Sequence, residues 1–218
     1  MKNHKLSKLL LASVISSLTV PTFAQQLEEV VVTASKRAEN LQDIPQAVTA
    51  FSSDRLVELG IVETSDLMGA VPNIQVTSAY GRTQPNFSIR GISVANEFSA
   101  ATASPVGVYV DEVYQSFRAS HGQQLFDLES VEVLRGPQGT LYGRNTTGGA
   151  VNVNTIKPSL GEGASGFLNV RLGNYSYADF TGAVEATIIP DVLGVRLSGA
   201  VSEADGYVDN TLLGTDHP

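Results

Sequence analysis

The clearest pattern of hydrophobic and polar residues lies near the C-terminal end of the chain. Residues 166–173, 178–188 and 194–202 each place apolar side chains at every second position, with polar side chains between them. Turn residues at Asn174 and Pro190 separate the three segments. A period of two is that of a β-strand. The pattern predicts three antiparallel strands, either in a soluble sheet with one wet face or in the wall of a membrane β-barrel.

Upstream, short strand patterns alternate with short helix patterns. Ser53 and Gly60 have the residue types that begin and end a helix, and Thr64 is expected to cap a second helix. Strands are expected at 46–52, 73–78, 86–91, 106–114, 131–136 and 148–155, with a hairpin turn at Asp111 and Glu112 and a helical turn at 126–130. This mixture predicts a small α+β domain over residues 44–158.

The N-terminal residues have the pattern of a secretory signal peptide. Three lysines precede an apolar run at 9–20, and the small residues Thr22 and Ala24 mark a cleavage site after Ala24. A transmembrane helix needs roughly 20 apolar residues, so this run is too short for one. We therefore expect residues 1–24 to be removed, which leaves residues 25–43 as a polar N-terminal segment.

One short strand pattern stands alone in that polar segment. The sequence LEEVVVTA, residues 27–34, contains three consecutive valines, which favour an extended chain. The polar stretch of residues 35–43 follows it, and no partner strand is expected at hairpin distance. A short exposed strand of this kind can add itself to the sheet edge of another protein. The alternative is a first strand of the compact region itself.

Composition excludes several classes of function. The chain has a formal net charge of −8, which becomes −11 once the three lysines of residues 1–24 are removed. An acidic chain argues against nucleic-acid binding, which needs a basic surface. The chain has no cysteine and only three scattered histidines, so we expect no metal site and no cofactor.

A glycine-rich stretch, RGPQGTLYGRNTTGGAVNVNT, occupies residues 135–155. It lacks the lysine of a phosphate-binding loop and the glycine spacing of a dinucleotide-binding turn. No G-x-S-x-G motif occurs in the chain, and no histidine lies nearby to activate a nucleophile. We predict no catalytic residue, and we expect the glycines to allow tight turns and close backbone packing.

These motifs and their order resemble the plug domain of TonB-dependent outer-membrane receptors. The resemblance rests on EEVVVTA at 28–34, IRG at 89–91, VYVDEVY at 108–114 and the glycine-rich stretch, followed by the barrel-like strands. It implies energised uptake of a scarce substrate, with an iron–siderophore complex favoured over a cobalamin or a sugar. The implied fold is an α+β plug domain with a small mixed sheet and short helices, followed by the start of an antiparallel transmembrane β-barrel, which is incomplete here.

The resemblance also implies roles for particular residues. Arg90 and Arg135 end apolar strands, where an unpaired charge is costly, and would pair with glutamates of the barrel wall; the alternative is that both reach solvent. The C-terminal domain of TonB, an inner-membrane protein, would bind the TonB box, which comprises Glu28, Glu29, Val30, Val31, Val32, Thr33 and Ala34. Structural roles in the plug motif are expected for Gly91, Gly136, Pro137, Gly139, Gly143, Gly148 and Gly149.

Loops at the outer end of the plug are expected at 77–86, 93–105 and 114–124. Their aromatic and basic side chains would meet an anionic iron chelate, or they are ordinary loop residues. These candidate substrate contacts are Tyr80, Arg82, Phe98, Phe117 and Arg118.

The expected location is the cell outer membrane, whose lipid would cover the apolar face of the strands. A signal-transducing receptor of the same family would carry an extra domain before the box, and only two residues separate the predicted cleavage site from Leu27. A soluble periplasmic binding module is the other alternative, and a secreted enzyme is disfavoured by the missing catalytic cluster. Residues 163–218 provide too few strands for a bacterial barrel, which needs about 8, so we expect a fragment or a truncated product.

Overall fold

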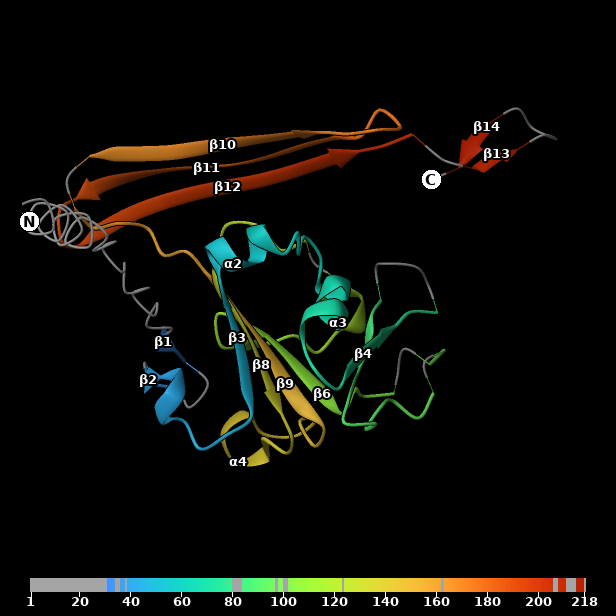
Figure 1. The fold of residues 1–218 in the computed structure, drawn as a ribbon. Coiled ribbons are helices and arrows are strands. Elements are labelled where there is room, and N and C mark those ends of the chain that lie inside the picture. Colours follow the sequence, from blue (N-terminus) through green and yellow to red (C-terminus); the bar gives the residue numbers. More distant parts are fainter. Residues whose placement is uncertain are drawn as a thin grey trace, which may run out of the picture.

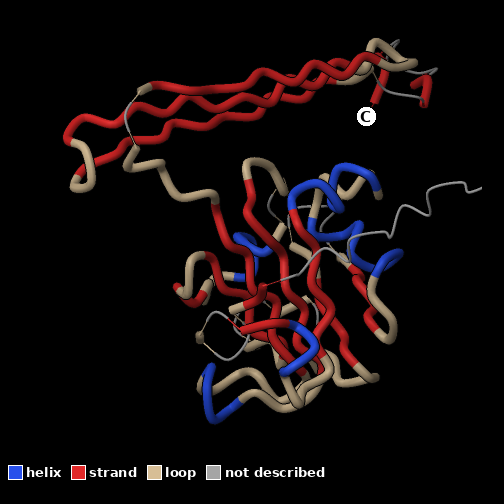
Figure 2. Tube along the Cα trace, turned by 60° about the vertical axis from the view of Figure 1, so that its left-hand side comes forward, coloured by secondary structure: helices blue, strands red, loops and turns tan. Residues whose placement is uncertain are grey.

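The computed structural model describes residues 31–33, 36–37, 39–79, 84–96, 98–99, 102–122, 124–161, 163–205, 208–210 and 215–217. The described residues from Val31 to Thr155 form a plug unit of strands and short helices, and a three-stranded sheet lies across one side of it (Figures 1 and 2). Among these residues, no helix has the length and apolar character needed to cross a membrane.

A five-stranded sheet with the order β3-β8-β9-β6-β7 forms the centre of the plug unit. β6 and β9 are parallel and the other neighbours are antiparallel, which confirms the predicted mixed sheet. Asp111 and Glu112 both have positive φ, 46° and 68°, and form the predicted turn between β6 and β7. The strands are β3 (Val48–Ser52), β6 (Val106–Val110), β7 (Val113–Tyr114), β8 (Leu128–Arg135) and β9 (Gly149–Thr155).

The short helices begin at slightly different residues than predicted. Ser52, not Ser53, is the N-cap of α2, because its side chain accepts a hydrogen bond from the Arg55 amide. Glu63, not Thr64, is the N-cap of η2, where the second helix was predicted, and it forms a capping box with Asp66. The helical segments are η1 (Leu41–Asp43), α2 (Ser53–Glu58), η2 (Thr64–Asp66), α3 (Leu67–Ala70), η4 (Arg118–His121) and α4 (Gly139–Tyr142).

The predicted helical turn at 126–130 is wrong. Leu128 already begins β8 and faces Thr155 in the antiparallel pair with β9. Pairing with a neighbouring strand therefore overrides the weak local helix preference of this short segment. Asp127, just before the strand, has a positive φ of 54°.

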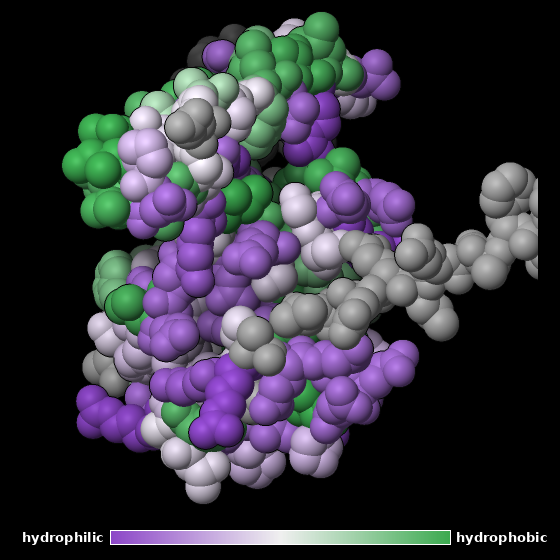
Figure 3. All heavy atoms as spheres, turned by 90° about the vertical axis from the view of Figure 1, so that its left-hand side faces the viewer, coloured by the Kyte–Doolittle hydropathy of each residue, from purple (hydrophilic) through white to green (hydrophobic). Residues whose placement is uncertain are grey.

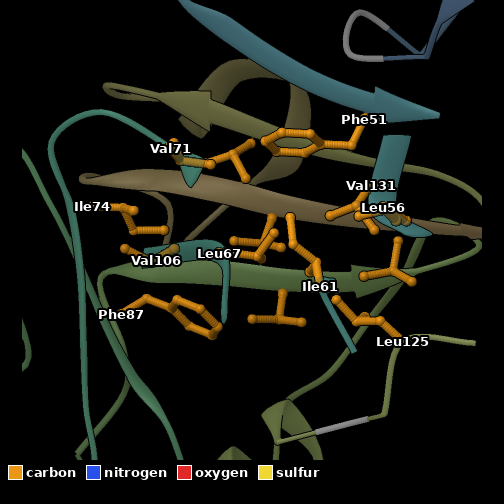
Figure 4. Packing of buried hydrophobic residues seen from close by; sticks show 14 of the residues in the cluster. Phe51, Leu56, Ile61, Leu67, Val71, Ile74, Phe87, Val106, Leu125 and Val131 are labelled. Carbon is orange, nitrogen blue, oxygen red and sulfur yellow. The ribbon is translucent and has the colours of Figure 1, made fainter. Parts of the chain in front are cut away.

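One face of the central sheet carries the main hydrophobic core. Val131 and Val133 of β8 are fully buried there, against α2, α3 and the hairpin of β4 (Ile74–Thr77) and β5 (Asn86–Ile89). Figure 4 shows Phe51, Leu67 and Phe87 among the side chains that meet in this layer. Each fully buried side chain of this size stabilises the fold by about 1.5–3 kcal/mol, so this layer holds the plug unit together.

The opposite face of the sheet is covered by the N-terminal segment and α4. The N-terminal segment contains β1 (Val31–Val32), β2 (Glu39–Asn40) and η1. A second, smaller cluster of buried residues forms there, and it consists of Val32, Ile44, Tyr109, Leu134, Tyr142 and Ala150.

The C-terminal part forms the three antiparallel strands that the alternating pattern predicts. They are β10 (Ala164–Leu172), β11 (Ala178–Ile189) and β12 (Leu193–Glu203). Further along the chain, β13 (Val208–Asn210) pairs antiparallel with β14 (Thr215–His217). Leu168, Val184 and Leu197 on the apolar face are 71%, 61% and 71% exposed. Hydrophobic residues gather on this sheet, whereas the plug unit below it is mainly hydrophilic on the same view (Figure 3). The polar face is the one that meets the plug unit, as in a barrel wall around a plug.

Candidate functional site: the docked N-terminal segment

In the described part of the N-terminal segment, β1 and β2 pair as a hairpin. Val31 faces Asn40 and Val32 faces Glu39 in an antiparallel pair, and the Lys36 amide donates to the Thr33 carbonyl oxygen at 2.7 Å in the turn. The expectation that no partner strand follows at hairpin distance is therefore wrong. The partner, β2, is two polar residues long, so it carries no apolar pattern that a sequence reading detects.

Val32 attaches this hairpin to the plug unit. Its side chain is completely buried in the smaller cluster, together with Leu134 of β8 and Ala150 of β9. Burial of one such side chain stabilises the docked state by about 1.5–3 kcal/mol. The hairpin is therefore held on the sheet by an apolar contact of moderate strength.

Thr33 makes the polar contacts of the same hairpin. Its backbone amide donates to Glu132 Oε1 at 2.7 Å, and its hydroxyl group donates to the same oxygen at 3.1 Å. Asn152 and Asn154 each donate a side-chain amide hydrogen to the Thr33 hydroxyl oxygen at 3.3 Å. One threonine thus joins the N-terminal segment to both central strands of the sheet.

Glu132 lies at the centre of this polar patch. Its side chain is fully buried, and it faces Asn152 across the β8–β9 pair. Asn154 also donates to Glu132 Oε1, at 3.3 Å. Because an unpaired buried polar group is costly, the removal of Thr33 would leave Glu132 without two of its donors. Glu132, Asn152 and Asn154 were not predicted from the sequence as site residues, although they occupy the alternate, polar positions of two otherwise apolar strands.

Two tyrosines close the patch on the side of α4. The Tyr109 hydroxyl group donates to the Tyr142 carbonyl oxygen at 2.6 Å, and the two rings meet edge to face. Burial and the nearby Glu132 raise the pKa of Tyr142 well above its usual value. Both phenols therefore stay neutral at physiological pH and act as structural groups.

Of the predicted TonB box, the described residues include Val31, Val32 and Thr33, while Glu28, Glu29, Val30 and Ala34 lie outside them. Since β2 and Glu132 already bind the backbone of this segment, its hydrogen-bonding groups are partly engaged. A partner strand that pairs with these residues would have to compete with contacts of the plug unit.

Arg90 and Arg135 lie close together. A guanidinium nitrogen of Arg90 is 3.1 Å from the position that a Cβ atom on Gly136 would take, next to Arg135. Arg90 is exposed, and Nε of Arg135 is buried without a hydrogen-bond partner. Within the part of the chain that the structure describes, neither arginine forms an ion pair.

The glycines of the plug motif permit two close approaches. Gly136 has a φ of 116°, and the Arg90 guanidinium group fills the space beside it. Gly149 has a φ of 156°, and a Cβ atom there would lie 2.3 Å from the Leu134 carbonyl oxygen. No other residue fits at Gly149 without displacement of the backbone of β8. Positive φ is also found at Gly91 and Gly143, whereas Pro137, Gly139 and Gly148 show no such requirement.

The described parts of the predicted substrate loops lie at the opposite side of the plug unit from β1 and β2 (Figure 1). Phe98 and Phe117 are 68% and 64% exposed, so both are available to a ligand. Tyr80 and Arg82 lie outside the described residues.

Arg118, the last of the candidate substrate contacts, is not an exposed side chain in the structure. It is buried, and its Nη1 donates to the carbonyl oxygens of Ser99 and Thr102 at 2.8 and 3.5 Å. Arg118 therefore supports the loop that carries Phe98, and its role as a substrate contact stays a prediction. No group of three or more metal-binding side chains was found in the described part of the chain.

Comparison with known proteins identifies relatives of this plug unit. The family model described as the TonB-dependent receptor plug domain matches residues 40–150. The pesticin receptor of Yersinia pestis is 34% identical over 138 residues, which cover 63% of this chain and 20% of that receptor. The vitamin B12 transporter BtuB of Vibrio vulnificus is 28% identical over 209 residues, which cover 93% of this chain and 33% of that protein. The chain thus spans between a fifth and a third of the length of these relatives.

A solved structure agrees with these matches. The ferric yersiniabactin uptake receptor FyuA from Yersinia pestis superposes with a TM-score of 0.69 at 27% identity. The superposition covers 78% of this chain and 26% of that receptor. The covered part is too large to be the plug unit alone, so the likeness extends into the strands that follow it.

Proposed function

The chain belongs to the TonB-dependent receptor family, and we propose that it is the N-terminal part of an outer-membrane receptor for energised uptake of a small molecule. The match of the plug-domain family model to residues 40–150 is the observation that carries this proposal. The exposed apolar face of β10–β12 supports a place in the outer membrane, because lipid would cover it. The chain thus acts in transport and not as an enzyme.

The layout follows from this assignment. Residues 1–24 are a signal peptide that directs secretion, residues 25–43 contain the TonB box and its polar leash, and residues 44–158 are the plug. Residues 163–218 are the first strands of the barrel. The superposition on the solved relative covers 78% of this chain, more than the plug alone, which supports the presence of both parts.

A ferric siderophore is the proposed substrate. The solved relative with 27% identity is an uptake receptor for ferric yersiniabactin. The exposed aromatic rings of Phe98 and Phe117 suit a chelate that carries aromatic groups. A cobalamin is the alternative that the likeness to a vitamin B12 transporter raises.

The C-terminal domain of TonB is the proposed protein partner. Residues 28–34 would pair with it by strand addition, in which backbone hydrogen bonds supply the attachment. The docking of Val32 and Thr33 on the plug supports a role in coupling, because a pull on this segment acts directly on β8 and β9. The proposed carboxylate partners of Arg90 and Arg135 belong to barrel strands that follow residue 218.

Uptake by cells that express the complete receptor tests this function. Radioactive iron would be supplied as a panel of ferric siderophores, and labelled cobalamin would be supplied separately, to cells with and without TonB. We expect accumulation of at least one ferric siderophore in cells with TonB, and none without it. Accumulation of cobalamin alone would exclude the proposed substrate, and uptake that is independent of TonB would contradict the proposed mechanism.

A further inference from the structure

A cluster of three charged side chains joins the plug unit to the three-stranded sheet. Arg196 of β12 donates from Nε to Asp127 Oδ2 at 2.9 Å and from Nη2 to the other oxygen of the same carboxylate. Its remaining nitrogen, Nη1, donates to Glu185 of β11 at 2.8 Å. A fork of this kind is the strongest geometry for an arginine–carboxylate pair.

All three side chains are withdrawn from solvent. The side chains of Arg196, Asp127 and Glu185 are 11%, 5% and 16% exposed. Breaking a buried pair of charges is costly, because the remaining partner keeps its desolvation penalty. The cluster is therefore unlike the exposed pair Arg55–Glu58, whose side chains are 57% and 64% exposed.

Each partner of Arg196 is itself fixed in place. The Asp127 carbonyl oxygen accepts from the Ile156 amide at 3.2 Å, so Asp127 joins the start of β8 to the end of β9. Glu185 accepts from the Ser165 hydroxyl group of β10 at 2.7 Å. The arginine fork thus connects the two central strands of the plug with all three strands of the sheet.

The rest of this interface is loosely packed. Two pockets of about 90 and 110 Å³ lie between the plug unit and the sheet, and both have room for several water molecules. One further side-chain bond that crosses it runs from Gln124 to Ser202 at 2.8 Å. Close apolar packing therefore does not explain how the plug unit is held here.

We propose that Arg196 is a plug-retention residue, which holds the start of β8 to the barrel wall through Asp127 while Glu185 keeps its guanidinium group in position. This inference rests on the proposed function, in which β10–β12 are barrel wall. It is separate from the roles of Arg90 and Arg135, because here the wall supplies the cation and the plug supplies the carboxylate.

Amide hydrogen exchange in the purified complete receptor tests this proposal. The variants are Asp127→Asn, Arg196→Gln, their combination, and the charge exchange Asp127→Arg with Arg196→Asp. Residues 124–130 should exchange at least about tenfold faster in either single variant. In the combined variant, residues 124–130 should exchange no faster than in one single variant. In the charge-exchange variant, part of the protection from exchange should return. Arg196→Lys, which keeps the charge without the fork, is a milder variant and should give an intermediate rate.

Arg55→Gln is the control, because Arg55 pairs with Glu58 on the exposed surface of α2 and makes no contact with the three-stranded sheet among the ion pairs of the described residues. It should leave the exchange of residues 124–130 unchanged. Unchanged exchange in the Arg196 variants, or fully additive effects of the two single variants, would overturn the proposal. The measurement needs neither substrate nor TonB, so its outcome is independent of transport. Coupling between Asp127 and Arg196 in a receptor that transports nothing would confirm this inference while the proposed function fails. A receptor that transports but shows no such coupling would refute this inference alone.

Discussion

Replacement of Thr33 by valine should release the N-terminal segment from the plug. Valine keeps the shape of threonine but loses the hydroxyl group, which donates to Glu132 at 3.1 Å and accepts from two asparagine side chains at 3.3 Å. A hydrogen bond to a charged group contributes about 1.5–3 kcal/mol. Since each 1.4 kcal/mol is a factor of ten, the population of undocked hairpin should rise roughly 10- to 150-fold.

Thiol labelling measures this population directly. The chain has no cysteine, so Val32→Cys supplies a single thiol at a position that is fully buried in the docked state. Its labelling rate under native conditions reports how often the hairpin opens. Thr33→Val in this background should raise the rate by the factor given above, with the plug fold retained.

Thr155→Val is the control for this experiment. Thr155 also donates from its hydroxyl group to a carboxylate, Asp111, at 2.7 Å, but this pair is exposed and does not touch the N-terminal segment. It should leave the labelling rate at residue 32 unchanged. Equal rates in the Thr33 and Thr155 variants would refute the view that Thr33 holds the segment on the sheet.

Three further outcomes are expected. The double variant Arg90→Ala with Arg135→Ala in the complete receptor should raise leakage of large hydrophilic antibiotics and protease cleavage of the plug; unchanged values for both would exclude pairing with the barrel. Burial lowers the pKa of His121 below its usual value of 6.5, so the unfolded chain takes up a proton first as the pH falls. The plug should therefore lose stability below about pH 6.5, and chemical denaturation should show that His121→Gln removes this pH dependence even if it lowers stability overall. Residues 25–218 alone, expressed in the periplasm, should neither insert into the outer membrane nor transport substrate, because an open sheet edge in lipid leaves unpaired backbone groups. A heat-modifiable, membrane-inserted species with uptake activity would contradict this prediction.

The strands of the C-terminal sheet were predictable because a strict period of two needs no knowledge of the partner. The apolar positions of the alternation, such as Leu168, Val184 and Leu197, lie on the exposed face, whereas Ala183 is buried on the other face. The turn at Asp111 and Glu112 was predictable for a related reason. Two consecutive acidic residues between apolar runs leave few other conformations for the chain.

The docking of the N-terminal segment was not predictable from the sequence. The alternation in β8 places Glu132 on the face of the sheet opposite to that of Val131 and Val133. The alternation in β9 places Asn152 and Asn154 on the same face as Glu132. It does not show whether that polar face meets water or another part of the chain. Only the fold shows that residues 31–33 cover it and supply its hydrogen-bond donors.

The burial of Arg118 was not predictable from the sequence for a similar physical reason. A loop arginine is expected to reach solvent, because a buried cation needs compensating acceptors. Here the carbonyl oxygens of Ser99 and Thr102 provide them, and neither can be anticipated from residue types. The pattern gives candidate residues for a loop, but it does not distinguish the side chains that support the loop from those that face outward.

The central claim is that residues 28–34 couple the receptor to TonB, and the variant Val31→Pro tests it most directly. Proline removes a backbone donor and fixes φ, so strand addition at this position should fail. Cells that express the complete receptor with this variant should bind the ferric siderophore at their surface as the unmodified receptor does. They should accumulate no radioactive iron inside. Accumulation at the normal rate with proline at residue 31 would contradict the account.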